Sequence, residues 1–109
     1  MKYMMLVCMD PAIEAAEADI EKGVEAWIAE TDGKYLRLEG NPLDPGDATT
    51  VRVRGGETLR SDGPFAETKE LMVGYDILDC KDLDEAIEIA AKHPLTGLGA
   101  MELRPFGAG

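Results

Sequence analysis

The sequence predicts an α+β protein in which two helices lie on one face of a β-sheet. Its apolar residues switch between strand spacing and helix spacing, in the order strand, helix, strand, hairpin, strand, helix, strand. The strands at 2–9 and 71–79 are apolar on both faces, which is typical of strands that are covered on both sides. A length of 109 residues corresponds to a single domain, residues 1–109.

The first helix is expected directly after the strand at 2–9. Asp10 is a suitable N-cap, and Pro11 is a favoured first helical residue. Gly23 weakens this helix and marks a bend or a close approach. The helix is expected to end near Glu30. Its predicted buried stripe consists of Ile13, Ala16, Ile20, Val24, Trp27 and Ile28.

A short strand and a hairpin are expected in the middle of the chain. The strand is placed at 35–38, and the turn-forming residues at 39–47 predict a loop. Residues 49–54 and 57–61 are expected to pair as a hairpin, because a Gly-Gly pair separates two segments of strand character. Along the first arm, the side chains predicted to point inward are Val51 and Val53, and those predicted to point outward are Thr50, Arg52 and Arg54.

The last third of the chain is expected to form a strand, a helix and a strand. The strand at 71–79 contains Gly74, which indicates a bulge or a close approach of another group. Asp82 and Glu85 have the spacing of a capping box, so the helix should begin there. The final strand is placed at 99–105. The helical side chains predicted to be buried are Leu83, Ala86, Ile87, Ala90 and Ala91.

Two helices can cover only one face of this sheet. The strands at 2–9 and 71–79 would then present a large apolar surface on the other face, and such surfaces usually mark interfaces. We therefore expect a second copy of the chain to cover this surface, sheet against sheet, in a two-fold homodimer.

The charge of the chain narrows the choice of partners. There are 22 acidic and 11 basic residues, which gives a net charge of −11. Nucleic acids and anionic membranes attract cationic proteins, so neither is expected as a partner. No apolar run approaches the ~20 residues that span a bilayer, and no signal-peptide cleavage site follows the apolar N-terminal stretch. We expect a cytoplasmic protein. Four acidic residues share one face of the first helix, which favours solubility or, alternatively, weak cation binding or a basic partner: Glu14, Glu17, Glu21 and Glu25.

Residues 62–70, Asp-Gly-Pro-Phe-Ala-Glu-Thr-Lys-Glu, form the main candidate site. This segment gathers ionisable side chains around a stiff Gly-Pro turn at the edge of the sheet. Asp62 is a candidate catalytic residue, and alternatively it caps its own turn. Glu67, Lys69 and Glu70 are candidates for ligand contact, and alternatively they pair with one another and rigidify the loop.

Two further candidates lie outside that segment. His93 is the only histidine, and its ordinary pKa suits proton transfer near neutral pH. It is a candidate general acid or base, oriented by a carboxylate, and alternatively a cation at the C-terminal end of the second helix. Arg104 is a candidate for holding an anionic ligand group, and an ion pair with Glu102 is the alternative.

Sequence motifs for cofactors are missing. The chain has no metal-ligand spacing, phosphate-binding loop or nucleophile elbow, so no metal and no cofactor are expected. Cys8 and Cys80 lie on apolar strands, where cysteine usually acts as a small apolar residue.

Several strings resemble one protein family. The segment Asp62–Glu70 resembles the signature of the DGPF group within the YCII-related proteins. Further strings support the resemblance along the whole chain: Met1-Lys2-Tyr3-Met4, Asp79–Ala86, His93-Pro94 and Met101–Pro105.

The resemblance implies a ferredoxin-like antiparallel sheet with two helices on one face and an inserted β-hairpin, assembled as a dimeric α+β barrel. In that fold the strands at 2–9 and 71–79 are antiparallel neighbours. Cys8 and Cys80 would then lie at opposite ends of the pair, so a disulfide between them is not expected.

The family resemblance carries no established reaction to this chain. Broader relatives have a histidine near the first helix, paired with an aspartate, and this chain has no histidine there. Related domains also resemble neighbours or fusion partners of extracytoplasmic-function sigma factors. Two functions are therefore expected as alternatives. One is a homodimeric small-molecule-binding protein or enzyme with a polar pocket near residues 62–70. The other is a non-catalytic regulator that binds a protein partner such as a sigma factor.

Overall fold

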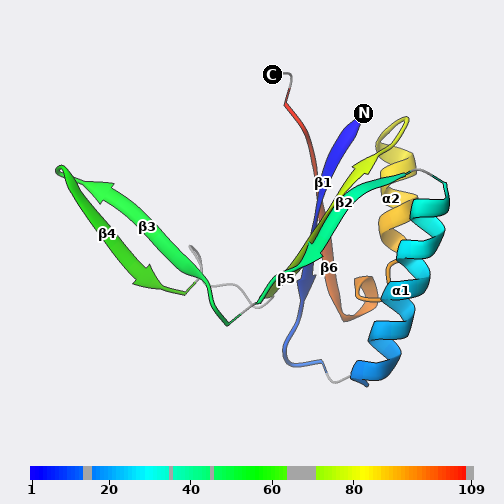
Figure 1. Ribbon diagram of the computed structural model, residues 1–109, viewed down its shortest axis with the longest axis horizontal. Helices are drawn as coiled ribbons and strands as arrows, with labels where there is room; N and C mark the ends of the chain where they lie inside the picture. Colours follow the sequence, from blue (N-terminus) through cyan, green and yellow to red (C-terminus); the bar gives the residue numbers. More distant parts are fainter. Residues whose placement is uncertain (14–15, 35, 45, 64–70, 108–109) are drawn as a thin grey trace.

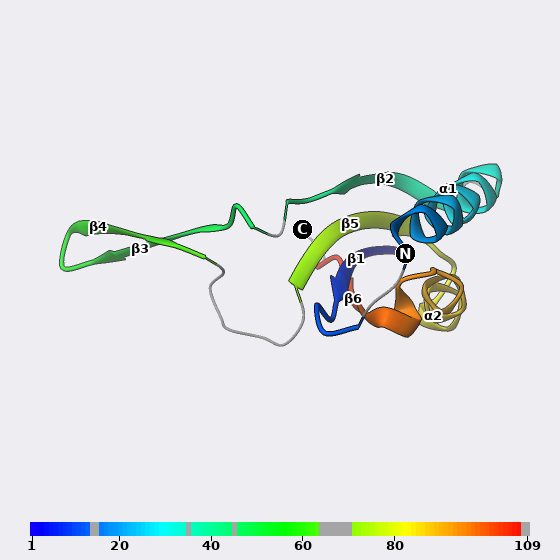
Figure 2. The ribbon, with the colours of Figure 1, turned by 90° about the horizontal axis from the view of Figure 1, so that it is seen from below.

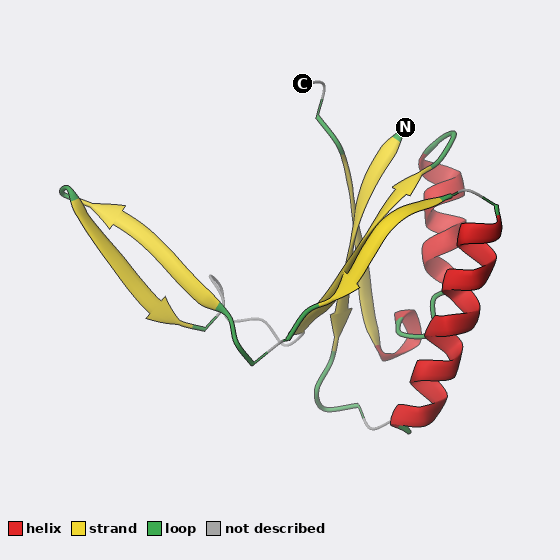
Figure 3. Cartoon of the chain, in the orientation of Figure 1, coloured by secondary structure: helices red, strands yellow, loops and turns green. Residues whose placement is uncertain are grey.

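Four strands form one antiparallel sheet, and the two helices lie side by side on one face of it (Figure 1, Figure 3). The computed structural model describes residues 1–13, 16–34, 36–44, 46–63 and 71–107. The elements in chain order are β1 (Lys2–Met9), α1 (Glu17–Gly33), β2 (Arg37–Pro42), β3 (Thr49–Arg54), β4 (Glu57–Asp62), β5 (Leu71–Asp79), α2 (Leu83–Ala91), the 3-10 turn η1 (Thr96–Leu98) and β6 (Gly99–Pro105).

The strand order is β2-β5-β1-β6, and each neighbouring pair is antiparallel. This is a ferredoxin-like α+β fold in which the β3–β4 hairpin is inserted between β2 and β5, as the resemblance implied. Cys8 lies opposite Met72 near one end of the β1–β5 pair, and Cys80 follows the other end, so no disulfide joins these two described residues. None of the described helices is both long enough and apolar enough to cross a membrane.

The core lies between the sheet and the helices. Alternate residues of the central strands, Tyr3, Met5 and Val7 of β1 and Leu78 of β5, are buried under the helices. From the helical side they are covered by Trp27, Ala86, Ile89, Ala90 and Leu95.

Neither of the described helices lies on the other sheet face, which we call the open face. Its centre consists of half-buried apolar side chains that alternate with the core residues: Met4, Leu6 and Cys8 of β1, and Tyr75 and Ile77 of β5. The prediction that both central strands are apolar on two faces is therefore confirmed for the single chain.

The start of the first helix was predicted wrongly. α1 begins at Glu17 rather than at Pro11. Asp10 instead closes a local turn: its Oδ1 accepts a hydrogen bond from the N–H of Ala12 at 2.9 Å, and its carbonyl accepts one from Ile13. Aspartate side chains commonly offer the backbone this alternative to a helix. Ile13 is consequently exposed, as is Ala16, whereas Ile20, Val24, Trp27 and Ile28 face the core or its margin.

Gly23 allows α1 to approach the chain that follows α2. A Cβ atom at Gly23 would lie 3.0 Å from the Cβ atom of Pro94, which is tighter than ordinary van der Waals contact. The close approach predicted for Gly23 is confirmed, and it brings α1 next to the loop that contains His93.

The second strand is longer than predicted. β2 covers residues 37–42 and pairs with β5, so the turn-forming segment that we assigned to a loop is partly a strand. Its glycine and proline are tolerated because β2 is an edge strand, paired on one side only, and Pro42 is its last residue.

The β3–β4 hairpin was predicted at the correct residues. Gly55 and Gly56 have φ values of 58° and 80°, the positive values that a tight two-residue hairpin turn requires. The prediction that Val51 and Val53 point inward is wrong, since they are 61% and 59% exposed. The alternating pattern identified the two faces of the hairpin, but no element that the structure describes covers the face with the valines.

The elements of the last third lie where the sequence placed them. The pairing of β1 with β5 shifts register next to Gly74, which confirms the predicted bulge. Asp82 caps α2 by accepting a hydrogen bond from the N–H of Glu85 at 2.9 Å, and the Glu85 side chain accepts one from the N–H of Lys81.

The buried face of α2 differs from the prediction. Leu83, Ile87 and Ala91 form one row along the helix and are exposed, whereas Ala86 and Ala90 are buried as predicted. Ile89, which we did not predict, is buried as well. The helix carries neighbouring apolar rows, and the sheet and α1 cover only part of them.

Candidate functional site

His93 lies just after α2, on the helical side of the sheet, and is 5% exposed. Its Nδ1 accepts a hydrogen bond from the N–H of Leu95 at 3.1 Å, and its ring packs against Trp27 with 4.8 Å between centroids. Burial lowers the pKa of His93 to about 4. The imidazole is therefore uncharged at neutral pH, which argues against the alternative of a cation at the end of α2.

The second ring nitrogen of His93 has no hydrogen-bond partner among the described residues. Because Nδ1 accepts a hydrogen bond, the proton of the neutral ring is on Nε2. Across the described residues, every fully buried side-chain nitrogen or oxygen has a hydrogen-bond partner, and no partner is found there for Nε2. Nε2 is therefore not fully buried, and its N–H can donate a hydrogen bond to a molecule in the cavity beside it.

This cavity lies between α1, the strands β2 and β5, and the loop after α2. Its volume is about 220 Å³ and its walls are mainly apolar, with Val24, Trp27, Val73 and Leu95 among the lining residues. Figure 2 shows α1 beside β2 and β5, with α2 further along the sheet. An apolar cavity of about 150 Å³ is known to be sufficient for benzene. The helix–sheet cavity, as we call it, therefore has room for a ring with polar substituents.

A buried ion pair forms part of the cavity wall. Nε of Arg37 on β2 donates to Oδ1 of Asp76 on β5 at 2.7 Å, and the two side chains are only 15% and 9% exposed. Burial raises the pKa of Asp76 although Arg37 opposes that shift. For Arg37, burial would lower the pKa, but Asp76 and Asp32 outweigh it and the pKa is raised.

Gly40 provides the space for this pair. A Cβ atom at Gly40 would collide with Oδ1 of Asp76 and would lie 2.6 Å from an Nη atom of Arg37. The second carboxylate oxygen of Asp76, Oδ2, has no hydrogen-bond partner within the described part of the chain, so by the same reasoning as for His93 it is not fully buried. The cavity thus combines an uncharged N–H donor with a carboxylate acceptor whose charge is already balanced.

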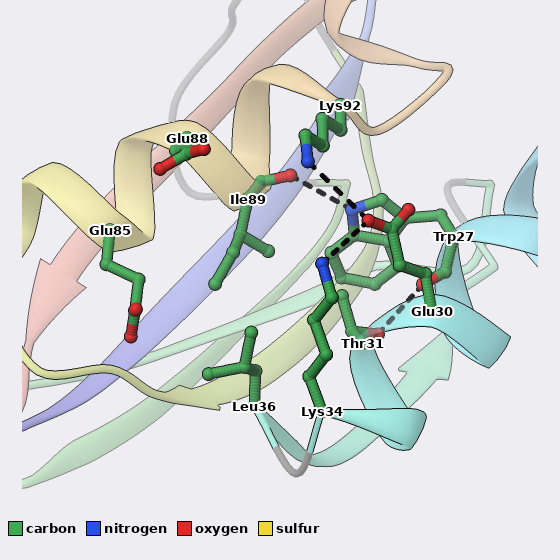
Figure 4. A pocket seen from close by; sticks show the side chains of 9 residues that line it. All are labelled: Trp27, Glu30, Thr31, Lys34, Leu36, Glu85, Glu88, Ile89 and Lys92. Carbon is green, nitrogen blue, oxygen red and sulfur yellow. Dashed lines mark hydrogen bonds and ion pairs between the residues drawn. The ribbon is translucent and has the colours of Figure 1, made fainter.

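A second hollow, of about 140 Å³, lies between the two helices (Figure 4). Its charged groups largely satisfy one another, since Glu30 lies 3.1 Å from Nζ of Lys34 and 3.5 Å from Nζ of Lys92. The hydrogen bond from Lys34, with Lys92 nearby, lowers the pKa of Glu30. Trp27 lines this hollow and also the helix–sheet cavity, and its Nε1 donates to the carbonyl of Ile89 at 3.0 Å. The helix–sheet cavity is the stronger candidate because its polar atoms have capacity left for a ligand.

The predicted site residues that can be described do not come together. Asp62 ends β4 on the hairpin and is exposed. Arg104 lies on the open face, 70% exposed, and donates to Glu102 at 2.9 Å. His93 lies on the opposite side of the sheet from Arg104. Three further candidates fall outside the described residues, so their roles stay predictions: Glu67, Lys69 and Glu70.

Arg37 and Asp76 were missed by the sequence analysis. A signal for Asp76 was present, because it is a charged residue in the middle of a strand that is otherwise apolar on both faces. Charged residues in such positions are normally paired. Arg37, on a neighbouring strand, is the partner that the pattern could not identify.

An uncharged imidazole N–H and a carboxylate that line the same cavity can bind a molecule that both accepts and donates hydrogen bonds. Such an N–H can also polarise a carbonyl oxygen without transferring a charge to it, as neutral histidines do in some enzymes. Among the residues that the structure describes, no group of three or more potential metal-ligating side chains is placed to hold a metal ion.

The fold and this cavity define a ferredoxin-like α+β protein with a partly open cavity between helix and sheet. The sequence profile of the YCII-related domain matches residues 1–106, and the chain belongs to that family. A relative from Rhizobium meliloti (strain 1021), described as uncharacterized protein R00369, is 36% identical over 106 residues, covering 79% of this chain and 84% of its own. The narrower assignment to the DGPF group stays a prediction.

The fold is similar to that of a solved structure of another protein. That protein is 5-chloro-2-hydroxyhydroquinone dehydrochlorinase (TftG) from Burkholderia phenoliruptrix AC1100, in complex with 2,5-dihydroxybenzoquinone. The TM-score is 0.61, the sequence identity is 17%, and the match covers 100% of this chain and 96% of that one.

Proposed function

We propose that this protein binds a small cyclic molecule in the helix–sheet cavity. The observation that carries the proposal is the free donor capacity of His93 Nε2 in a mainly apolar space that Asp76 also lines. A binding site usually consists of such an apolar cavity with few, well-placed polar groups. Since Arg37 already balances Asp76 and His93 is uncharged, the site favours a ligand without net charge.

The size and chemistry of the cavity favour a ring with hydroxyl groups. A hydroxyl oxygen can accept from Nε2 of His93, and a hydroxyl proton can be donated to Oδ2 of Asp76. Structural similarity to a protein that binds 2,5-dihydroxybenzoquinone supports a ligand of this class, although at 17% identity the similarity itself concerns the fold. In this proposal His93 donates a hydrogen bond to the ligand through Nε2. A catalytic role of His93 would use the same hydrogen bond.

Hydroquinone, a neutral dihydroxylated ring, is a suitable first probe. We expect it to change the fluorescence of Trp27, the only tryptophan, because Trp27 lines the cavity. His93→Asn retains an acceptor for the N–H of Leu95 but withdraws the donor at Nε2, and should weaken binding roughly fivefold or more, the value of one hydrogen bond. Val24→Phe should abolish binding by filling the cavity.

Fluorescence that responds equally in the wild type and in Val24→Phe would show that hydroquinone binds elsewhere. An absence of any response to hydroquinone or to 2,5-dihydroxybenzoquinone would contradict the proposed ligand class. It would favour the alternative function, in which exposed acidic residues of α1 such as Glu17, Glu21 and Glu25 bind a basic protein partner.

We also propose that two copies pack open face to open face as a homodimer. The support is the apolar centre of the open face, where Leu6 of the central strand β1 lies between Tyr75 and Glu102 of the neighbouring strands. A sheet face of this kind in a soluble protein is usually covered. The assembly would be the dimeric α+β barrel that the family resemblance implies.

Leu6→Arg is expected to convert the dimer into a monomer at micromolar concentration, because a bulky charged side chain would replace an apolar contact at the centre of the interface, where the neighbouring Glu102 already pairs with Arg104. Light scattering measures the change directly. Ile87→Arg is the matched control, since Ile87 is an exposed apolar residue on α2, on the other side of the sheet. A wild-type monomer, or a Leu6→Arg dimer, would contradict the proposed interface.

A further inference from the structure

The β3–β4 hairpin projects from the body on the side of the open face. In Figure 1 and Figure 2 the helices lie on one side of the four-stranded sheet and the hairpin extends from the other side. β3 and β4 form a separate two-stranded sheet and pack mainly against each other. The hairpin therefore overhangs the space in front of the open face.

The base of the hairpin is held by specific hydrogen bonds. The N–H of Gly63 donates to the carbonyl of Ala48 at 2.8 Å, and the buried Thr50 hydroxyl donates to the carbonyl of Gly63 at 2.8 Å. Gly63 has φ of 107°, a conformation that favours glycine. These hydrogen bonds join the two ends of the hairpin, so that its strands leave the body side by side.

The described part of the body leaves most of the hairpin surface exposed. Val51 and Val53 share one face, opposite Arg60 and Thr58, and Leu59 is exposed on the other face. A two-stranded hairpin is at best marginally stable in water without further packing. Exposed β-branched side chains on such an extension indicate a surface that another molecule covers.

The charge of the hairpin identifies that molecule. The hairpin, residues 49–62, contains three arginines, one glutamate and one aspartate, a net charge of +1. The rest of the chain carries −12, which gives the total of −11. The hairpin is a basic extension of an acidic body, and another copy of the same body is complementary to it.

We propose that the β3–β4 hairpin is an arm that grips a second copy of this chain. The inference rests on the proposed open-face dimer and adds a second contact to it. When a second copy covers the open face, the overhanging hairpin lies against its side, buries Val51 and Val53 there, and places Arg54 and Arg60 near acidic side chains of that copy. Two-fold symmetry makes this contact twice in each dimer.

The arm is tested by Val51→Thr/Val53→Thr, which keeps side-chain shape and strand propensity but adds a polar group at each position. Both side chains are exposed in the single chain, so its fold should not change. We expect the dimer dissociation constant, measured by sedimentation, to rise at least tenfold, because the variant affects two arms. Ile87→Thr, a matched change on α2, should have no effect.

A second variant tests the electrostatic part. Arg54→Gln/Arg60→Gln should weaken the dimer and should flatten the dependence of its dissociation constant on salt between 50 and 500 mM NaCl, because salt screens exposed charges. If the wild type is a dimer and both hairpin variants dimerise with the same dissociation constant as the wild type, the arm is overturned and the open-face dimer stands. A wild-type monomer would overturn both. Loss of binding in the hairpin variants with retention in Ile87→Thr supports the arm.

Discussion

Arg37→Met is expected to lower the free energy of unfolding by about 3–5 kcal/mol at pH 7, a large part of the stability of a domain of this size. The reason is the carboxylate that remains. Asp76 has a side chain only 9% exposed, and Arg37 is the cation that donates to it. Denaturation by urea measures the loss. Arg37→Met/Asp76→Leu should recover most of it, because no uncompensated charge is then buried.

The same variant should depend on pH in a defined direction. The folded-state pKa of Asp76 is already raised above its ordinary value, and removal of Arg37 raises it further, because Arg37 opposes that shift. When folding raises the pKa of a carboxyl group, the group costs no stability at a pH below its unfolded-state pKa, here 3.8. As the pH rises from there through the folded-state pKa, the carboxyl group ionises and the free energy of unfolding falls. The defect of Arg37→Met should therefore shrink towards pH 4.

Lys34→Met provides a control for the loss of a cation. Lys34 pairs with Glu30 at the surface, where such pairs contribute little, so the variant should have nearly wild-type stability. The loss of unfolding free energy in Arg37→Met could prove equal at pH 4 and pH 7, or no larger than the loss in Lys34→Met. Either result would contradict the view that Arg37 and Asp76 form a buried ion pair.

His93 is expected to destabilise the protein by roughly 3 kcal/mol when the pH falls from 6.5 to 4. The unfolded chain binds a proton at His93 below about pH 6.5, whereas the folded chain binds it only below about pH 4, because the ring is buried. The stabilising effect of the neutral ring is therefore complete above pH 6.5 and is lost as the pH falls to about 4.

His93→Asn isolates this effect from the titration of the many carboxylates. Its side-chain oxygen can accept the hydrogen bond from the N–H of Leu95, and it does not titrate. The difference in unfolding free energy between wild type and variant should decrease by roughly 3 kcal/mol between pH 6.5 and pH 4. A constant difference across this range would indicate a histidine that remains protonated or solvated in the folded state.

Local signals in the sequence were sufficient for several elements. The cap of α2 depends on two side chains three residues apart, Asp82 and Glu85, and the hairpin turn depends on two adjacent glycines. The two-faced apolar character of β1 and β5 was equally readable, because alternate residues of a strand lie on opposite faces. Each of these depends on neighbours in the chain, so the prediction needed no knowledge of distant segments.

The errors arose where distant segments compete with local preference. β2 extends through Gly40 and Pro42 because pairing with β5 is available along one side. The strand pattern also assigned Val51 and Val53 to a covered face, although the hairpin lies outside the body of the single chain. A periodic pattern shows which residues share a face, and long-range packing determines what covers that face.

The candidate site shows the same division between what neighbouring residues determine and what distant segments determine. His93 attracted attention as the only histidine, and its sequence context suggested a charged or proton-transferring group. Its neutral state, its contact with Trp27 and its place in a cavity with the Arg37–Asp76 pair all come from residues far apart in the chain. The sequence alone established the family resemblance, the α+β class and the apolar second face. The cavity and the ionisation of its side chains depend on burial, which exists only when β2, β5, α1 and the loop after α2 are packed together.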